Sequence, residues 1–203
     1  GGSTPIGLFT EILNQIDKKF EIKSNFFWVD ERCVDPSSVD SNFGSANKHF
    51  FSKVNISNNN IFRIRGEEKP EIEASNYTEL LKTKTENIKN IPSLDLCLLG
   101  IGGDGHTASI FPHELTKLSD RSDCVVGINP DSGQKRVSLS IKQINNSKEV
   151  IFHVCGSGKK DVVDMIISKR DKYLDLPASH ILPKSKNLSW YLDFDSAETF
   201  MGT

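Results

Sequence analysis

The sequence lacks a long apolar run, a cysteine framework and an excess of basic charge. No stretch of roughly 18 consecutive apolar residues occurs, which excludes a transmembrane helix, and no segment resembles a signal peptide. The four cysteines, Cys33, Cys97, Cys124 and Cys155, form no Cys-x-x-Cys pair, so we expect neither a zinc site nor a disulfide framework. With 25 basic and 27 acidic residues the net charge is −2, and no nucleic-acid-binding surface is expected. These absences favour a reduced, cytoplasmic protein with a small-molecule site.

The residues that are present can bury one core. Hydrophobic residues make up 36% of the 203 residues, a length typical of one α/β domain. Apolar, β-prone runs predict strands at 26–29, 94–99, 124–128, 137–141, 150–154 and 190–192. The spacing of apolar residues predicts helices at 5–19, 75–90 and 158–169. Strands that alternate with helices indicate an α/β fold with a mostly parallel sheet and helices on both faces.

The chain begins in a turn that leads into a helix. Gly1-Gly2-Ser3 comes first, Thr4 suits the N-cap and Pro5 suits the first helical position. Such a turn normally follows a strand, and the sequence has no starting methionine. We therefore expect residues 1–203 to form a single domain that is N-terminally incomplete.

Two glycine turns have the composition of an anion-binding site. Gly1-Gly2-Ser3 precedes the first predicted helix, and Gly156-Ser157-Gly158 precedes a helix that begins with Lys159 and Lys160. Backbone N–H groups at a helix N-terminus favour a phosphate or a carboxylate. The two turns indicate a phosphorylated ligand; the alternative is that the glycines only end the strands.

Charged residues flank two of the predicted strands. Asp30, Glu31 and Arg32 close the first apolar run, at the sheet edge where α/β proteins bind ligands. The Arg32 guanidinium suits phosphate oxygens, and each charge-assisted hydrogen bond contributes roughly 1.5–3 kcal/mol. Arg136 precedes the strand at 137–141 and is a second candidate. Solvated surface positions remain the alternative for both arginines.

The densest segment runs from Gly100 to Pro112. Its first six residues fit Gly-x-Gly-x-x-Gly, the fingerprint of a dinucleotide site. Pro112 limits the following helix to a turn or two, and no strand ending in an acidic residue follows at the required distance, so that interpretation fails. His106 instead suits a general base that takes a proton from water, with Asp104 fixing its tautomer. A buried structural histidine is the alternative.

Other catalytic patterns are absent from the sequence. No Gly-x-Ser-x-Gly elbow occurs, so a serine hydrolase of the α/β-hydrolase type is not supported. His49, His113, His153 and His180 show no metal-ligand spacing.

Six short motifs together resemble those of the 6-phosphogluconolactonase family, whose superfamily also contains glucosamine-6-phosphate deaminase. They occur in the family's order, and six motifs in register are far more specific than one. The motifs are Gly-Gly-Ser-Thr-Pro at 1–5, Asp-Glu-Arg-Cys-Val at 30–34, Asp-Ser-Asn-Phe-Gly at 40–44, Gly-Gly-Asp-Gly-His-Thr-Ala-Ser-Ile-Phe-Pro at 102–112, Arg-Val-Ser-Leu-Ser at 136–140 and Gly-Ser-Gly-Lys at 156–159.

The resemblance implies a modified doubly wound, NagB- or Rossmann-like α/β fold without metal or cofactor. It also implies hydrolysis of 6-phosphoglucono-δ-lactone to 6-phosphogluconate in the pentose phosphate pathway. By motif position, His106 is the general base and Asp104 its support. The residues expected to bind the substrate or its phosphate are Gly1, Gly2, Ser3, Asp30, Arg32, Asn42, Gly105, Arg136 and Lys159.

Two other functions stay open. The deaminase pattern has a glutamate that works beside the histidine, and the corresponding position here holds Phe111, which argues against that activity. A non-catalytic phosphosugar-binding module would need neither Asp104 nor His106. Some members of the family are fused to glucose-6-phosphate dehydrogenase, and a fusion to or association with that enzyme is compatible with how this chain begins.

Two placements also stay open. Ser132-Gly133-Gln134-Lys135 stands where the family often has a proline-rich approach to the arginine, which leaves the position of Arg136 unsettled. Lys159 and Lys160 are adjacent, so the choice of the phosphate-binding lysine depends on register.

Overall fold

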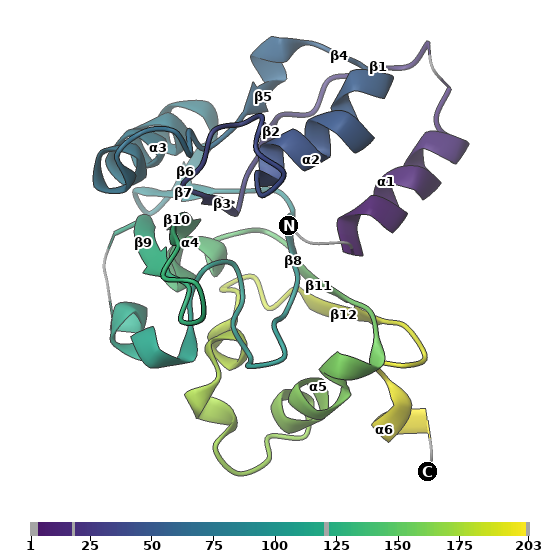
Figure 1. Cartoon of the computed structure of the whole chain (residues 1–203), viewed down its shortest axis with the longest axis vertical. Coiled ribbons are helices and arrows are strands. Elements are labelled where there is room, and N and C mark those ends of the chain that lie inside the picture. Colours follow the sequence, from purple (N-terminus) through teal and green to yellow (C-terminus); the bar gives the residue numbers. More distant parts are fainter. Residues whose placement is uncertain (1–3, 18, 120–121, 202–203) are drawn as a thin grey trace.

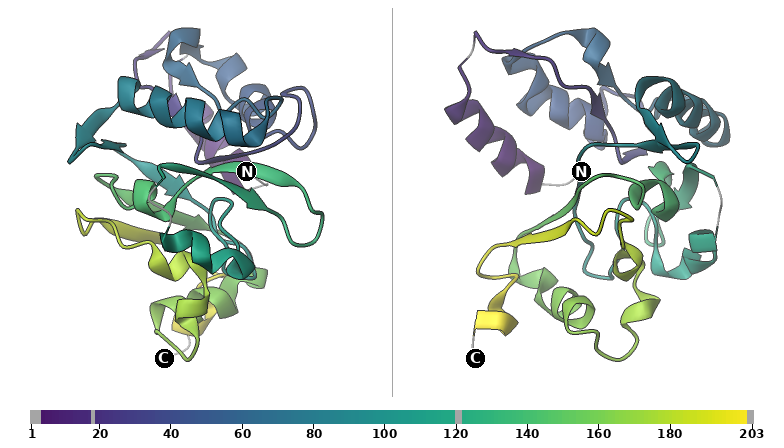
Figure 2. Two further views of the ribbon diagram at one scale, coloured as in Figure 1. Left: turned by 90° about the vertical axis from the view of Figure 1, so that its left-hand side faces the viewer. Right: turned by 180° about the vertical axis from the view of Figure 1, so that it is seen from behind.

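A computed structural model of the chain describes residues 4–17, 19–119 and 122–201. The strands lie in a central layer, with α2 and α3 on one side and α5 on the other (Figures 1 and 2). The helices are α1 (Thr4–Gln15), α2 (Asn42–His49), α3 (Pro70–Lys84), α4 (Ile141–Ile144), α5 (Lys160–Ile167) and α6 (Glu198–Met201). Among the described residues, none of these helices combines the length and apolar character needed to cross a bilayer.

The strands are short and form several small sheets. They are β1 (Glu21–Ile22), β2 (Phe26–Phe27), β3 (Asp30–Arg32), β4 (Asn55–Ile56), β5 (Ile61–Phe62), β6 (Glu86–Ile88), β7 (Ile91–Ser93), β8 (Cys97–Leu99), β9 (Cys124–Ile128), β10 (Lys135–Leu139), β11 (Val150–Val154) and β12 (Leu188–Leu192). One three-stranded sheet has the order β12-β11-β8 and is parallel. A second has the order β3-β10-β9 and is antiparallel.

The expectation of a mostly parallel sheet is therefore met only in part. The pairs β1–β4 and β2–β5 are also parallel, whereas β6–β7 is an antiparallel hairpin. Within the antiparallel sheet, β9 and β10 run in opposite directions because a short turn joins them, in which the Asn129 carboxamide oxygen accepts hydrogen bonds from Asp131 N and Ser132 N. The doubly wound strand order stays a prediction, and the predicted turn at residues 1–3 lies outside the described residues.

The core joins the two three-stranded sheets to the helices. Leu81 of α3 and Leu139 of β10 are fully buried, and Phe152 of β11 stacks on Trp190 of β12 with ring centroids 4.1 Å apart. Tyr77 of α3 is buried as well, and its hydroxyl accepts a hydrogen bond from Trp28 N at 2.7 Å. Burial of these large side chains supplies the main stabilisation and fixes α3 against β9 and β10.

Candidate active site

The loop after β8 folds back on itself and presents His106. Gly102 N donates to the His106 carbonyl oxygen at 2.8 Å, and the Thr107 hydroxyl donates to the Gly100 carbonyl at 2.9 Å. A Cβ atom on Gly102 would overlap both the His106 ring and the Asp104 carboxylate, so only glycine fits there. Gly105 has a φ of +83° and its carbonyl accepts a hydrogen bond from Ala178 N at 3.0 Å. The glycines of this motif therefore shape the loop around the imidazole.

His106 and Asp104 form a close pair. The Asp104 carboxylate lies 2.6 Å from His106 Nδ1 and also accepts the His106 backbone N–H at 3.1 Å. Partial burial raises the pKa of Asp104, but hydrogen bonds and electrostatic attraction from His106 outweigh this, so the pKa lies below its ordinary value. An ionised carboxylate only accepts hydrogen bonds, so His106 carries a proton on Nδ1. The lone pair of Nε2 is then available to take a proton.

Phe111 contacts both the histidine and an arginine. Its ring is almost fully buried, with its centroid 4.9 Å from that of His106. The Arg136 guanidinium carbon lies 5.6 Å from the same centroid, within the range of a cation–π contact. Two of the predicted site residues therefore pack against one aromatic ring.

Arg32 and Arg136 lie side by side on β3 and β10, where they are register partners. The Nε atom of each is buried and has no hydrogen-bond partner in the described part of the chain. Burial lowers the pKa of the Arg136 guanidinium, and the positive charge of Arg32 lowers it further. Arg32 Nη1 donates to the Asp40 carbonyl at 2.6 Å. Two guanidinium groups held together in this way form a site that attracts an anion.

The two adjacent lysines differ in their surroundings. Lys160 forms an ion pair with Glu198 of α6 at 3.0 Å. Lys159 lies at the histidine loop: a Cβ atom placed on Gly103 would be 4.0 Å from its ammonium nitrogen. In the turn before the two lysines, Gly156 has a φ of +96°. The Gly156 backbone N–H donates to the Asp193 carboxylate at 2.9 Å. Lys159 is therefore the lysine that faces the His106 loop.

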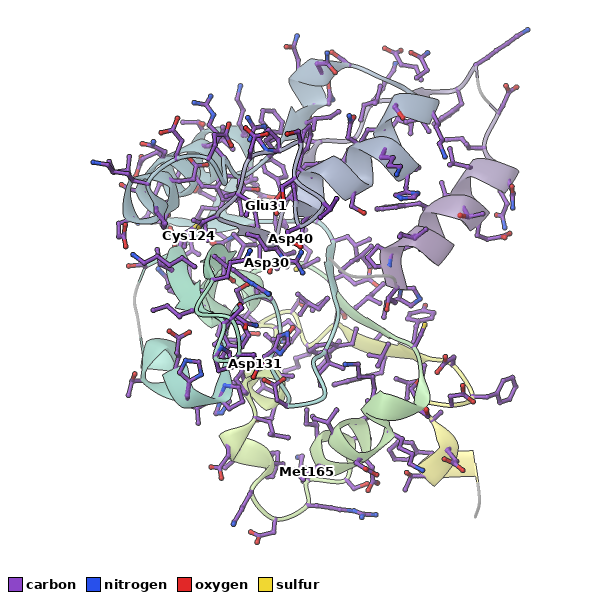
Figure 3. All side chains as sticks on the ribbon, in the orientation of Figure 1. Asp30, Glu31, Asp40, Cys124, Asp131 and Met165 are labelled. Carbon is purple, nitrogen blue, oxygen red and sulfur yellow. The ribbon has the colours of Figure 1, made fainter. Side chains whose placement is uncertain are left out.

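Asp30 and Asn42 are bonded to the protein itself. Asn42 Nδ2 donates to the Asp30 carbonyl at 2.9 Å, and the Asp30 carboxylate accepts the Ser109 hydroxyl at 2.7 Å. Figure 3 labels Asp30, whose side chain comes from β3. The hydrogen bonds of Asp30 and Asn42 connect the beginning of β3 to α2 and to the histidine loop.

A cavity of about 370 Å³ opens over the pair His106 and Asp104. It is lined by Gly103, Asp104, His106, Phe111 and the turn at 129–131. The Asn129-Pro130 dipeptide is a local signal for that turn, but no local pattern predicts its place beside the histidine loop, because the two segments are far apart along the chain. A second cavity of about 340 Å³, between the end of α1 and β4, is lined by none of the predicted site residues. Among the described residues, no cluster of three or more metal-binding side chains occurs.

A family model described as glucosamine-6-phosphate isomerases/6-phosphogluconolactonase matches residues 1–190. The chain belongs to this family. Among solved structures, the devB protein superimposes with a TM-score of 0.92 at 39% identity, over 98% of this chain and 84% of the other. The 6-phosphogluconolactonase of Trypanosoma brucei gives 0.85 at 27% identity, over 98% and 83%. The chain therefore has the fold of the isomerase/lactonase family, as the sequence resemblance implied.

Curated members of the family are similar to almost the whole of this chain. The 6-phosphogluconolactonase of Treponema pallidum is 38% identical over 91% of this chain and 76% of its own length. That of Haemophilus influenzae is 37% identical over 95% and 82%. The human GDH/6PGL endoplasmic bifunctional protein is 32% identical over 97% of this chain, which spans 25% of that longer protein.

Proposed function

We propose that this chain hydrolyses 6-phospho-D-glucono-1,5-lactone to 6-phospho-D-gluconate, the second step of the oxidative pentose phosphate pathway. The observation that carries the proposal is the arrangement around Phe111, where the His106 imidazole and the Arg136 guanidinium contact one ring. Curated relatives at 37 and 38% identity, named 6-phosphogluconolactonase, support it.

In the proposed reaction His106 acts as the general base. Nε2 takes a proton from a water molecule while the water oxygen attacks the lactone carbonyl carbon. The tetrahedral intermediate then breaks the bond to the ring oxygen, and the imidazolium returns the proton to that leaving oxygen. Asp104 holds the tautomer and stabilises the transient positive charge. A base in this position typically contributes about 10²–10⁴-fold to the rate.

The substrate's phosphate provides the positioning. Arg32 and Arg136 present adjacent guanidinium groups, and a bound phosphate would satisfy their buried Nε donors and offset their mutual repulsion. We assign Lys159 to the same anion because it lies beside the histidine loop. Gly1, Gly2 and Ser3 are proposed to complete this subsite from the N-terminal turn.

The deaminase alternative has less support. The position at which that activity places a glutamate beside the histidine holds Phe111, a buried ring without an ionisable group. A binding module without catalysis would not require the close pair of His106 and Asp104.

One assay separates these functions. Lactone is generated in place by glucose-6-phosphate dehydrogenase, and its disappearance is followed with and without the protein. We expect disappearance faster than the spontaneous opening. Release of ammonia from glucosamine 6-phosphate would establish the deaminase instead, and binding of 6-phosphogluconate without faster lactone loss would establish the module.

The cellular context remains part of the proposal. The bifunctional relative named GDH/6PGL motivates a fusion to or association with glucose-6-phosphate dehydrogenase, which forms the lactone. A cytoplasmic location is proposed from the sequence alone.

A further inference from the structure

We infer that Ser109 is a positioning residue that fixes the His106 loop to the strands carrying Arg32 and Arg136. The inference rests on the proposed function, because it concerns how the base and the phosphate subsite of that reaction are held in register.

Ser109 is fully buried and both of its donors reach the antiparallel sheet. Its hydroxyl donates to Asp30 Oδ2 at 2.7 Å, and its backbone N–H donates to the Ser138 hydroxyl oxygen at 3.1 Å. Asp30 and Ser138 are register partners on β3 and β10, two residues along each strand from the paired arginines Arg32 and Arg136. One serine therefore bonds to both of the arginine-bearing strands.

The third strand of this sheet also contacts Ser109. A Cβ atom on Gly127 of β9 would overlap the Ser109 carbonyl oxygen, so the absence of a side chain lets the loop approach. Gly127 is the register partner of Arg136 on the side opposite Arg32. The backbone of Ser109 is thus seated directly on the sheet.

The turn that contains Ser109 needs such support. Ala108 has a φ of +51°, a conformation that residues with a side chain rarely adopt. The turn is closed by the Ile110 N–H, which donates to the Thr107 carbonyl at 3.0 Å. A backbone of this kind persists where surrounding contacts hold it, and the two hydrogen bonds of Ser109 are such contacts. His106 lies immediately before this turn, so its position depends on them.

The same contacts give Asp30 an internal role. One oxygen of its carboxylate accepts the Ser109 hydroxyl, and the other lies 3.4 Å from the Asn42 amide nitrogen. Asp30 acts here as the anchor of Ser109, whereas the sequence motif had suggested that it binds substrate.

The test measures kcat and KM for the lactone in Ser109→Ala, Asp30→Ala, Asp30→Asn and the double variant Ser109→Ala/Asp30→Ala. We expect Ser109→Ala to lower kcat by about 10- to 100-fold with KM little changed, because the imidazole is displaced while the arginines stay on their strands. The double variant should lose no more kcat than the worse single variant, since both changes remove the same hydrogen bond. Asp30→Asn keeps an oxygen that accepts the hydroxyl, so its loss should be smaller than that of Asp30→Ala.

Ser93→Ala is the matched control. Ser93 is buried and its hydroxyl donates to the Asn146 carbonyl at 2.8 Å, so this change also removes a buried hydrogen bond. It should lower Tm without lowering kcat. A folded Ser109→Ala protein with wild-type kcat, an equal loss in Ser93→Ala, or equal losses in Asp30→Asn and Asp30→Ala would overturn the inference. Should Ser109→Ala not fold, the two Asp30 variants carry the test. Failure of the proposed function is distinguished by a wild-type chain that does not accelerate lactone opening.

Discussion

At the scale of single residues, the site depends on the absence of side chains as much as on charge. The Asp104–His106 pair is only two residues apart in the chain, and the backbone must curl tightly to bring both groups together. Gly102 permits this, because its α-carbon faces the imidazole and the carboxylate at once. The proposed base is therefore held by a loop that requires glycine at position 102.

Gly102→Ala should abolish most of the lactonase activity while the protein still folds. The added methyl group would push the His106 ring away from Asp104, and a displacement of about 1 Å costs on the order of 100-fold in rate. The measurement is kcat in the coupled lactone assay, with circular dichroism to verify folding. Gly100→Ala in the same loop is the control, since a Cβ atom there meets nothing within 4 Å. Equal activity of the two variants would contradict this account of the loop.

Arg32→Ala should weaken binding of the phosphorylated lactone much more than binding of an unphosphorylated lactone. Loss of one or two charge-assisted hydrogen bonds to phosphate, each worth roughly 1.5–3 kcal/mol, raises KM for the phosphorylated substrate by at least about tenfold. The comparison is kcat/KM for both substrates. Arg170→Ala is the control, because Arg170 forms its ion pair with Asp164 on α5. Equal losses on both substrates would remove Arg32 from the phosphate subsite.

At the scale of elements, the N-terminus of α2 is capped by a carboxylate from β3. Buried Glu31 accepts hydrogen bonds from Asn42 N and Phe43 N, both at 2.7 Å, and from the Ser41 hydroxyl. Burial raises the pKa of Glu31, and these hydrogen bonds oppose that effect. A negative group at a helix N-terminus is favoured by the helix dipole and by the free N–H groups of the first turn. The strand and the helix are thereby joined next to Arg32.

Glu31→Ala should lower the free energy of unfolding by at least about 1–3 kcal/mol, because it leaves buried N–H donors of α2 without an acceptor. For a chain of this length, each kcal/mol lowers Tm by roughly 2–4 °C. Calorimetry or denaturant unfolding measures the effect. Glu79→Ala, which removes only an exposed ion pair with Lys82, should change the free energy by no more than about 0.5 kcal/mol. A Glu31→Ala protein as stable as Glu79→Ala would contradict the capping role.

The sequence predicts elements well where local composition decides them. Strands β9 and β11 have the predicted bounds, 124–128 and 150–154, because each consists mainly of apolar, β-prone residues. Helix α3 begins earlier than predicted, at Pro70, and carries Glu71 and Glu73 in its first turn and Lys82 and Lys84 in its last. These charges and the proline are local signals that apolar spacing alone did not use.

Elements that depend on distant contacts were missed. Helix α2 is only eight residues long with few apolar residues, and its N-terminus is stabilised by Glu31 from another element. The very short strands β1, β4 and β5 were not predicted, because they form through their pairing partners rather than through their own composition, whereas β2 lies within the predicted strand at 26–29. In the site, the motif indicated His106 and Asp104, but the contact of Ser109 with Asp30 spans 79 positions and no local pattern encodes it.

At the scale of the whole molecule, the site lies where two differently built sheets meet. The parallel sheet supplies β8, from which the His106 loop emerges, and the antiparallel sheet supplies both arginines. Figures 1 and 2 show these sheets adjoining in the central layer of strands. Global stability and the geometry of the site are therefore linked.

The lowered pKa of Asp104 predicts how this residue contributes to stability as pH changes. The folded pKa of Asp104 lies below its ordinary value of 3.8, so its ionised form stabilises the fold at pH values above 3.8. That contribution is lost as pH falls through the lower, folded pKa. The stabilising difference in unfolding free energy between wild type and Asp104→Asn should therefore shrink as the pH falls below about 4. Denaturant unfolding at several pH values measures it, and a difference that grows in acid would contradict the predicted sign.

The central claim is that the imidazole of His106 activates water against a lactone whose phosphate is held by Arg32 and Arg136. The most direct measurement compares wild type with His106→Gln in the coupled lactone assay, together with calorimetric binding of 6-phosphogluconate. The account predicts that kcat falls by about 10²–10⁴-fold while the product still binds with near wild-type affinity. A folded His106→Gln protein that opens the lactone as fast as wild type would contradict it.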